Sequence, residues 1–599
     1  MAKALTRDQV PVEETWDLSD LFQSEADYEE ALRWTVEAAD QFHKTYRGKL
    51  QSAEAVVQAL DAYEPILAEL DRMGNYVYLH WEADTQNPVH VARSQKYTDQ
   101  IAGVGSKLAF LEAELAQLDK DQLEAAGDAA PRYRTFLAHI IRRKDHLLSE
   151  REEALLAALS PVLEAPYEIY GEIKQGDIRF PAFEVEGQEI HMTYNAFENS
   201  LETDPNTALR RAASRVFYET LDQYKAGTAA AYLTQVRRDK IESKLRGYAS
   251  VFDYLLDRQD VDRTLYDRQI DVIMKDLAPI MQDYARYLKK VYGLDRMTSF
   301  DLKAPPVLGT SKTISFQEAG EIIRDGLSPL GEAYGAMLFE AFHNRWIDYA
   351  ENAGKSTGAF CSDCYKSHPY ILTSFNRQMN EVITLSHELG HAGQSILTNA
   401  HQNILNVDLS MYFVESPSTT NEIIMGNYLL KKAKGDKETR KQIIGQIISQ
   451  TYYHNFVTHL LEAAYQREVY RLIDQGESFD ADRLSEIYRQ VLTDFWGDAV
   501  EIEKGSALTW MRQPHYYMGL YSYTYSAGLT VGTKMALRIM EEGPSAAAQW
   551  LEVLRQGGSK KPVELAQMAG VDITTDQPLK ETIAYIGRLV KELVEEDEA

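Results

Sequence analysis

Apolar residues recur at helical spacing through most of the first third of the chain. Residues 24–165 are rich in Ala, Leu, Glu, Gln, Lys and Arg, which favour helices. In the stretch ADYEEALRWTVEAADQFHKTY the spacing predicts one buried face, formed by Tyr28, Ala31, Leu32, Val36 and Ala39. We therefore expect long antiparallel helices here.

Two segments interrupt this helical pattern. Residues 176–197 place apolar residues on both sides of a Glu186-Gly187 turn signal, which predicts a β-hairpin. Residues 356–376 again have strand character, and helical spacing returns from Arg377 onwards, apart from a glycine-rich stretch at residues 506–532. The expected fold class is mainly α, with a small antiparallel sheet beside the helix that follows residue 376.

The charge balance narrows the classes of partner. The 599 residues include 91 acidic and 63 basic side chains, a formal net charge of −28. Nucleic acid and anionic membranes both require a cationic face, so neither is an expected partner. The N-terminus has no secretory signal pattern, no run of 18 apolar residues occurs, and there are only two cysteines. These features predict a cytoplasmic protein.

The stretch HELGH, residues 387–391, suggests metal chemistry. A helix from Arg377 to Thr398 would put His387 and His391 on one face, because residues four apart are neighbours on a helix. Two such imidazoles suit one tetrahedral zinc ion, and Glu388 could act as general base on a water molecule beside it. The alternative interpretation is a buried helix with two core histidines.

A catalytic zinc site requires a third protein ligand. The metzincin pattern is excluded, because Gln394 and Leu397 stand where that pattern has glycine and histidine. Glu415 lies at a predicted helix start in YFVESPSTTNE and is the expected third ligand of one Zn²⁺ per chain. Glu422 falls two turns further on approximately the same face, where it could accept the second ring N–H of a ligand histidine.

HELGHAGQS followed by FVESPS resembles the zinc core of the thimet oligopeptidase and oligoendopeptidase F family, including its Pz-peptidase branch. The order and spacing of both motifs match. The resemblance implies that His387, His391 and Glu415 bind zinc and that Glu388 is the base. It also implies a two-lobed helical ellipsoid whose deep channel admits oligopeptides, with an N-terminal domain over residues 1–200 and a peptidase domain over residues 201–599.

The glycine-rich stretch contains many possible hydrogen-bond donors. Its polar rings are His515, Tyr516, Tyr517, Tyr521, Tyr523 and Tyr525. In the thimet family a histidine and a tyrosine-rich segment reach over the zinc and donate to the tetrahedral intermediate. That similarity implies this role for Tyr523 and His515, with Tyr521 next. The spacing between the histidine and the last tyrosines is shorter here than in the thimet pattern.

Two other groups of potential ligands have weaker support. Cys361 and Cys364 form a C-x-x-C pair near His368, which could be a redox pair or half of a zinc site. No second C-x-x-C occurs, and the pair lies in a predicted strand rather than at a helix start, so we expect neither use. His454 and His459 are five apart in a helical run, and we interpret them as packing residues that do not share a face.

Three functions compete at this point. The leading hypothesis is a zinc oligoendopeptidase that hydrolyses internal bonds of short peptides. A zinc carboxypeptidase is the first alternative, and Arg512 could supply the cation that binds a free carboxylate. The second is a helical peptide-binding protein without activity, in which Glu388 would have no purpose.

Overall fold

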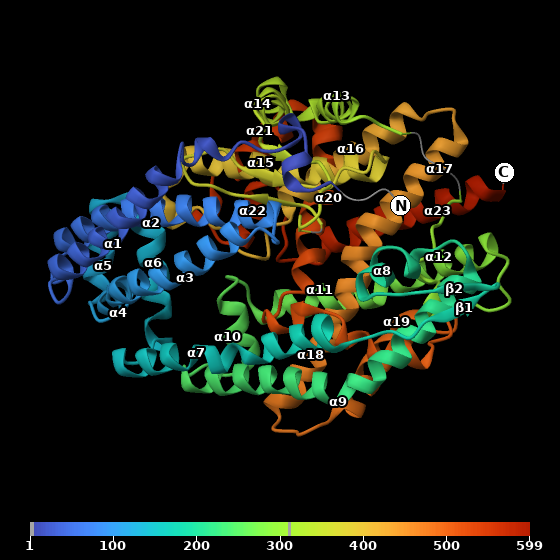
Figure 1. Cartoon of the computed structure of the whole chain (residues 1–599), viewed down its shortest axis with the longest axis horizontal. Helices are drawn as coiled ribbons and strands as arrows, with labels where there is room; N and C mark the ends of the chain where they lie inside the picture. The colour runs from blue at the N-terminus through green and yellow to red at the C-terminus, as the bar shows by residue number, and fades with distance from the viewer. Residues whose placement is uncertain (1–4, 309–312, 357, 599) are drawn as a thin grey trace.

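Helices dominate the N-terminal region of the computed structural model, which describes residues 5–308, 313–356 and 358–598 (Figure 1). The first six helices gather at one end of the molecule. The helices of this region are α1 (Glu25–Tyr46), α2 (Ala53–Ala83), α3 (Pro88–Leu108), α4 (Phe110–Leu115), α5 (Lys120–Ala129), α6 (Arg134–Arg143) and α7 (Glu150–Gly171). The expectation of a mainly α fold is confirmed.

Local sequence explains how α1 begins and which face it buries. Ser24 caps the helix by accepting a hydrogen bond from the backbone N–H of Asp27. Tyr28 and Ala39 are buried as expected, but Val36 is 38% exposed and Thr35 is fully buried instead. Thr35 is seven residues after Tyr28, which returns a helix to nearly the same face. Val36 is eight residues after Tyr28 and is rotated from it by about 80°, so Thr35 and not Val36 shares the buried face.

The predicted hairpin is present. Strands β1 (Phe183–Val185) and β2 (Gln188–Ile190) pair antiparallel, with Val185 opposite Gln188. Glu186 and Gly187 both have positive φ, of 52° and 79°, as a two-residue hairpin turn requires.

Further helices, both short and long, follow the hairpin. They are α8 (Tyr194–Asn199), α9 (Thr207–Leu245), α10 (Val251–Asp257), α11 (Arg263–Asp276), α12 (Ala278–Val291), α13 (Phe316–Gly326) and α14 (Glu332–His343). The longest, α9, runs along α7 in the lower half of Figure 1. A short 3₁₀ turn, η7 (Leu201–Thr203), precedes α9.

The sheet that precedes residue 377 has three strands. Its order is β3 (Ile347–Asp348), β5 (Tyr370–Leu372), β4 (Phe360–Ser362). Strands β4 and β5 are antiparallel, as expected, but β3 pairs parallel to β5, so the sheet is mixed and the antiparallel prediction is corrected. A two-residue strand carries no periodic signal, and only the fold brings β3 to the edge of β5.

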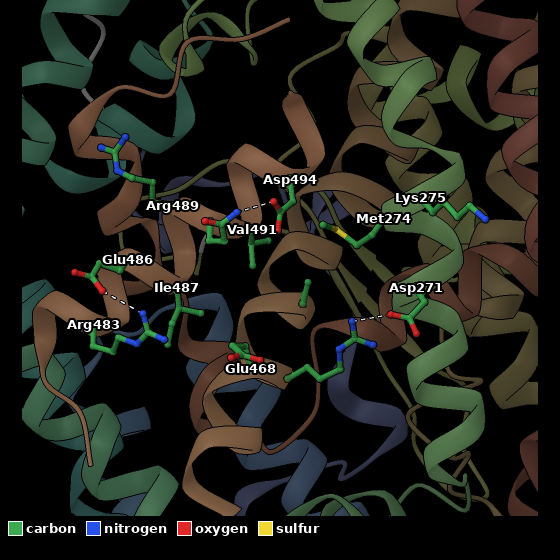
Figure 2. A pocket seen from close by; sticks show the side chains of 13 residues that line it. Asp271, Met274, Lys275, Glu468, Arg483, Glu486, Ile487, Arg489, Val491 and Asp494 are labelled. Carbon is green, nitrogen blue, oxygen red and sulfur yellow. Dashed lines mark hydrogen bonds and ion pairs between the residues drawn. The ribbon is translucent and has the colours of Figure 1, made fainter. Parts of the chain in front are cut away.

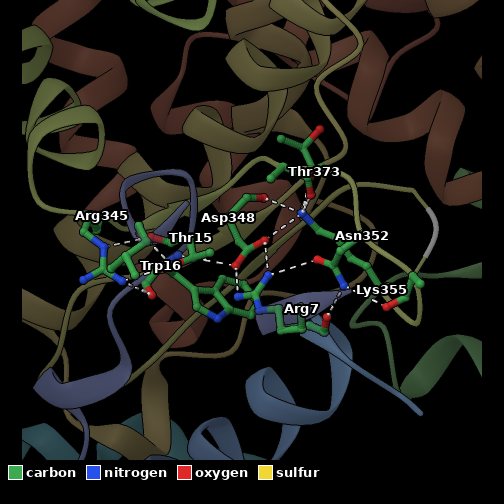
Figure 3. Close-up of polar contacts among 12 residues, drawn as sticks. Arg7, Thr15, Trp16, Arg345, Asp348, Asn352, Lys355 and Thr373 are labelled. Carbon is green, nitrogen blue, oxygen red and sulfur yellow. Dashed lines mark hydrogen bonds and ion pairs between the residues drawn. The ribbon is translucent and has the colours of Figure 1, made fainter. Parts of the chain in front are cut away.

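A buried polar cluster ties the N-terminal segment to this sheet (Figure 3). Asp348 is fully buried and accepts hydrogen bonds from Arg7 Nη1 at 3.0 Å, from Lys355 Nζ at 2.7 Å and from the backbone N–H of Trp16 at 3.4 Å. A buried carboxylate needs such partners, so the cluster fixes residues 7–16 against β3.

The last third of the chain contains the helices around the HELGH motif. Its elements are α15 (Met379–His401), α16 (Ser416–Lys432), α17 (Lys437–Gln446), the π-helix η11 (Ile447–Thr458), α18 (His459–Asp474), α19 (Ala481–Trp496), the 3₁₀ segments η12 (Lys504–Met511) and η13 (Pro514–Tyr517), α20 (Tyr523–Glu542), α21 (Pro544–Leu554), α22 (Pro562–Met568) and α23 (Gln577–Glu598). Helices α15, α16 and α20 pack side by side in the upper half of Figure 1.

Among the described residues, most buried apolar side chains belong to three hydrophobic cores. The largest extends from Tyr170 to Leu593. A second lies within the N-terminal helices, and a third joins α1 and α2 to the sheet through residues such as Tyr28 and Tyr370. The domain boundary between residues 200 and 201 stays a prediction. Among the described residues, no helix combines the length and the apolar character needed to cross a membrane.

Candidate metal centre

Helix α15 carries the HELGH motif and begins two residues later than expected. Val382, Leu385 and Leu389 form its fully buried side. His387 and His391 are partly exposed on the neighbouring face, and their ring centroids lie 5.0 Å apart. The structure therefore brings the two predicted ligands together, as the spacing of four indicates.

Helix α16 brings Glu415 to the two histidines. Glu415 is the residue before the first helical turn, and Pro417 lies inside that turn, where its missing N–H costs no helical hydrogen bond. A Cβ on Gly390 would lie 2.6 Å from Pro417 O and Ser418 Cα. Only glycine in HELGH allows α15 to approach the start of α16 this closely.

The three candidate ligand atoms have the spacing of a tetrahedral metal site. His387 Nε2 and His391 Nε2 each lie 3.4 Å from Oε2 of Glu415. Ligands of a tetrahedral zinc ion with bonds of about 2.1 Å stand about 3.4 Å apart. Ser418 Oγ donates to the same Oε2 at 2.8 Å and fixes its direction. The donor set and its geometry fit zinc.

The charged side chains of the site shift each other's pKa values. Burial alone would raise the pKa of Glu415, but His391 and His387 outweigh it and hold this pKa well below its usual range. Glu415 is therefore an ionised carboxylate, as a metal ligand must be. Burial lowers the pKa of His387, and hydrogen bonds to Glu415 and Glu422 raise it well above its usual value.

A second layer of hydrogen bonds orients His387. Its Nδ1 lies 2.5 Å from Oε1 of Glu422, which leaves Nε2 directed at Glu415. Glu422 in turn accepts a hydrogen bond of 2.6 Å from Thr451 on η11. This is the position predicted for Glu422, and a carboxylate there fixes the ring orientation of a metal ligand. Thr451 was not anticipated from the sequence.

Glu388 is only 5% exposed and lies on the side of α15 that faces β4. Burial raises the pKa of Glu388, the two histidines lower it, and Glu415 and Glu422 raise it again. A carboxylate with a raised pKa is a better proton acceptor. Glu388 also adds to the raised pKa of the Cys361 thiol, whose first cause is burial, so β4 runs beside it.

Cys361 and Cys364 are both free thiols. Burial raises the pKa of each above its usual range, so neither is an activated thiolate. His368 instead stacks on Trp346, with ring centroids 4.5 Å apart. The expectation that this pair is not redox-active fits these surroundings.

The tyrosine-rich segment places two tyrosines beside His515, the predicted Tyr521 and also Tyr525. Tyr525 hydroxyl lies 3.4 Å from His515 Nε2, and Tyr521 packs against both rings. Glu415 contributes to the raised pKa of Tyr521 and of Tyr525, of which burial is the first cause, so both hydroxyls lie near the metal centre. The sequence did not single out Tyr525.

Tyr523 does not join this group. Its side chain is fully buried, and its hydroxyl donates to Gln259 Oε1 at 2.5 Å. Its ring packs on Tyr266 and Tyr412. The structure therefore corrects the expectation that Tyr523 reaches the metal centre and puts Tyr525 in that place.

His454 and His459 do meet, against expectation. The π-helix η11 ends between them, and their Nε2 atoms lie 3.0 Å apart. A π-helix widens each turn so that residues five apart become neighbours. His459 also bonds to Glu462 and stacks on Tyr525, with ring centroids 4.1 Å apart.

A cavity lies away from the candidate metal centre (Figure 2). It has a volume of about 890 Å³ and is lined by α11, α18 and α19. Two ion pairs line it: Arg467 with Asp271 at 2.8 Å and Arg483 with Glu486 at 3.2 Å. None of the residues of the candidate metal centre lines this cavity.

A helical body around two histidines and a glutamate, with a second buried glutamate beside them, is the arrangement that metal-dependent hydrolases use. Residues 200–585 match peptidase family M3, and residues 114–180 match the Oligopeptidase F model. The chain belongs to peptidase family M3.

Individual proteins agree with this assignment. Oligopeptidase PepF of Bacillus subtilis is 30% identical over 96% of this chain and 86% of its own length. A crystal structure from Chlamydophila abortus has a TM-score of 0.87 at 23% identity and covers 99% of this chain and 100% of its own. Oligoendopeptidase-F from Enterococcus faecium has a TM-score of 0.75 at 22% identity, covering 96% and 99%. These two structures share the fold.

Proposed function

We propose that this protein is a zinc-dependent oligoendopeptidase that cuts internal bonds of short peptides. The observation that carries the proposal is the equal spacing of 3.4 Å from both histidine Nε2 atoms to one oxygen of Glu415, with Glu388 buried beside them. The names of relatives such as Oligopeptidase PepF of Bacillus subtilis support the substrate class.

Each side chain has a task in this reaction. A zinc ion held by His387, His391 and Glu415 would polarise the scissile carbonyl and make a water molecule more acidic. Glu388 accepts the proton of the attacking water and delivers it to the leaving nitrogen, so its charge is restored at the end of the cycle. Tyr525 stays protonated because burial raises its pKa, and its hydroxyl can donate to the developing oxyanion.

The carboxypeptidase alternative loses its main support. Arg512 is 5% exposed and is held by Glu202 at 3.0 Å and Glu198 at 3.1 Å. A guanidinium already paired with two carboxylates is not available for the free carboxylate of a substrate. This favours cleavage inside the peptide over removal of its last residue.

Cleavage of an internally quenched peptide of about ten residues, blocked at both ends, tests the proposal. Wild type should cut it at an internal bond, while Glu388→Gln should lose about 100- to 10,000-fold in kcat and keep its zinc. Glu381→Gln is the matched control, because Glu381 lies on the same helix and its carboxylate accepts hydrogen bonds from Asn376 and Asn380. Stoichiometric zinc without cleavage of any peptide would favour the peptide-binding alternative.

A further inference from the structure

A second group of polar side chains meets the tyrosine-rich segment beside the candidate metal centre. Oε2 of Glu462 lies 2.8 Å from His459 Nδ1 and 3.7 Å from His515 Nδ1. The other ring nitrogen of His515 faces the Tyr525 hydroxyl at 3.4 Å. Glu462 therefore stands behind His515, on the side opposite Tyr525.

Glu462 is a charged side chain in the interior of the protein. It is fully buried, and its Oε1 has no hydrogen-bond partner. Burial alone would raise its pKa, but His459 and His515 lower the pKa to about 2. Burying an ionised carboxylate costs free energy unless hydrogen bonds or opposite charges offset it, so its presence here calls for an explanation.

The geometry favours hydrogen bonding over a second metal ion. In the candidate metal centre both histidine nitrogens lie 3.4 Å from one oxygen of Glu415, whereas the two histidine nitrogens beside Glu462 lie 2.8 and 3.7 Å from its Oε2. The shorter distance is that of a charge-assisted hydrogen bond. His459 is held a second time by His454, so its ring is fixed on both sides.

We propose that Glu462, itself held by His459, is a positioning residue whose carboxylate attracts the Nδ1–H of His515, accepts its hydrogen bond when substrate binds, and keeps Nε2 of that ring towards Tyr525 and the substrate. This role rests on the proposed oligoendopeptidase function. A carboxylate offers only acceptors, so the ring that faces it must carry its proton on Nδ1. When the Tyr525 hydroxyl turns to a substrate oxygen, Glu462 still holds the ring.

The remaining gap between Glu462 and His515 fits a group that tightens during catalysis. At 3.7 Å the contact between Glu462 and His515 is longer than a hydrogen bond, and the 3.4 Å hydrogen bond on the Tyr525 side is a long one. Catalytic hydrogen bonds are often long before substrate binds and shorten in the complex. The negative charge of Glu462 attracts the Nδ1–H of His515, so this contact shortens when substrate binds.

Glu462→Gln is the first test, because it removes the charge and keeps the size of the side chain. We expect kcat to fall about 10- to 100-fold with KM changed less than about threefold and zinc content unchanged. Glu468→Gln is the matched control: it lies on the same helix but lines the surface cavity of Figure 2 and pairs with Arg471. It should retain wild-type kcat.

A double variant separates positioning from general damage. If Glu462 acts through His515, adding Glu462→Gln to His515→Ala should lower kcat no further than His515→Ala alone. Additive losses would overturn the proposal. The histidine tautomer is a second readout: nitrogen NMR of wild type should show the proton of His515 on Nδ1, with the peak assigned from His515→Ala.

The outcomes distinguish this inference from the proposed function. Wild type that binds zinc but cuts no peptide refutes the function itself. Wild type that is active, with a Glu462→Gln variant of unchanged kcat or with His515 protonated only on Nε2, refutes the positioning role alone. A second zinc ion lost in Glu462→Gln would show metal binding instead. The tautomer is measured on wild type, so it decides the question even if the variant fails to fold.

Discussion

At the scale of single residues, the position of each tyrosine in the tyrosine-rich segment decides which of them lies beside His515. Tyr521 and Tyr525 are four residues apart and both remain partly exposed, whereas Tyr523 between them is fully buried. Residues two apart on a helix point about 200° away from each other. Tyr523 and Tyr525 both lie on α20, so they point to different sides of the helix, and of these two Tyr525 is the one beside His515. Tyr521 precedes the helix and packs against both of these rings.

This arrangement predicts different effects for two conservative substitutions. Tyr525→Phe should lower kcat about 100-fold, since it removes one donor to the oxyanion. Tyr523→Phe should leave kcat near wild type, because its hydroxyl bonds to Gln259 in the interior. Steady-state kinetics on the blocked peptide measures both. The reverse order of effects would restore Tyr523 as the donor.

At the scale of elements, glycines set the distances between the three helices of the candidate metal centre. A Cβ on Gly528 of α20 would lie 2.6 Å from Cβ of Glu415, as Gly390 of α15 meets the start of α16. These contacts are with backbone or with the ligand residue itself, which cannot move aside. The spacing of the ligands thus depends on the absence of two side chains.

Gly390→Ala should therefore push α16 away from α15. We expect a loss of zinc affinity of about tenfold or more and a stability loss of about 1–3 kcal/mol from overpacking. Competition with a chelator measures the affinity, and thermal unfolding measures the stability.

Gly335→Ala on α14 is the control for this substitution. A Cβ there meets nothing within 4 Å, so zinc binding should not change and stability should stay equal or rise. Equal zinc affinity in Gly390→Ala and wild type would contradict the role given to this glycine.

At the scale of the whole molecule, a buried ion cluster joins distant parts of the largest core. Glu202 of η7 lies 3.0 Å from Arg512 and 2.6 Å from Lys303. Burial alone would raise the pKa of Glu202, but Arg512 and Lys303 lower it to about 2 from its usual 4.5. The folded state therefore binds this proton less readily than the unfolded chain.

The consequence is a loss of stability in acid. A depressed carboxyl pKa stabilises the fold above about pH 4.5, and this contribution of a few kcal/mol disappears as the pH falls towards about 2. Glu202→Gln should thus be less stable than wild type at pH 6. The difference in the free energy of unfolding between the two proteins should shrink as the pH falls from about 4.5 towards about 2. Denaturation series at several pH values measure it.

Glu219→Gln, on the exposed side of α9, provides the reference for this pH series. Its stability should follow wild type at every pH. A difference between wild type and Glu202→Gln that stays constant from pH 6 to pH 2 would contradict the assigned pKa of Glu202.

The sequence by itself determined the features that depend on neighbours along the chain. Helical spacing, the turn at Glu186-Gly187 and the positions of His387, His391 and Glu388 within one turn all follow from local geometry. The motif around Glu415 added the partner from the next helix through its resemblance to a known family.

Only the tertiary structure decided which distant side chains meet. Strand β3, the choice of Tyr525 over Tyr523, and the contacts of Thr451 with Glu422 and of Glu462 with His515 each join residues from separate elements. Such contacts depend on how helices are rotated and how closely they pack. A π-helix or a single glycine changes the rotation of a helix and its distance from its neighbours. The local periodicity of the sequence shows neither of these changes.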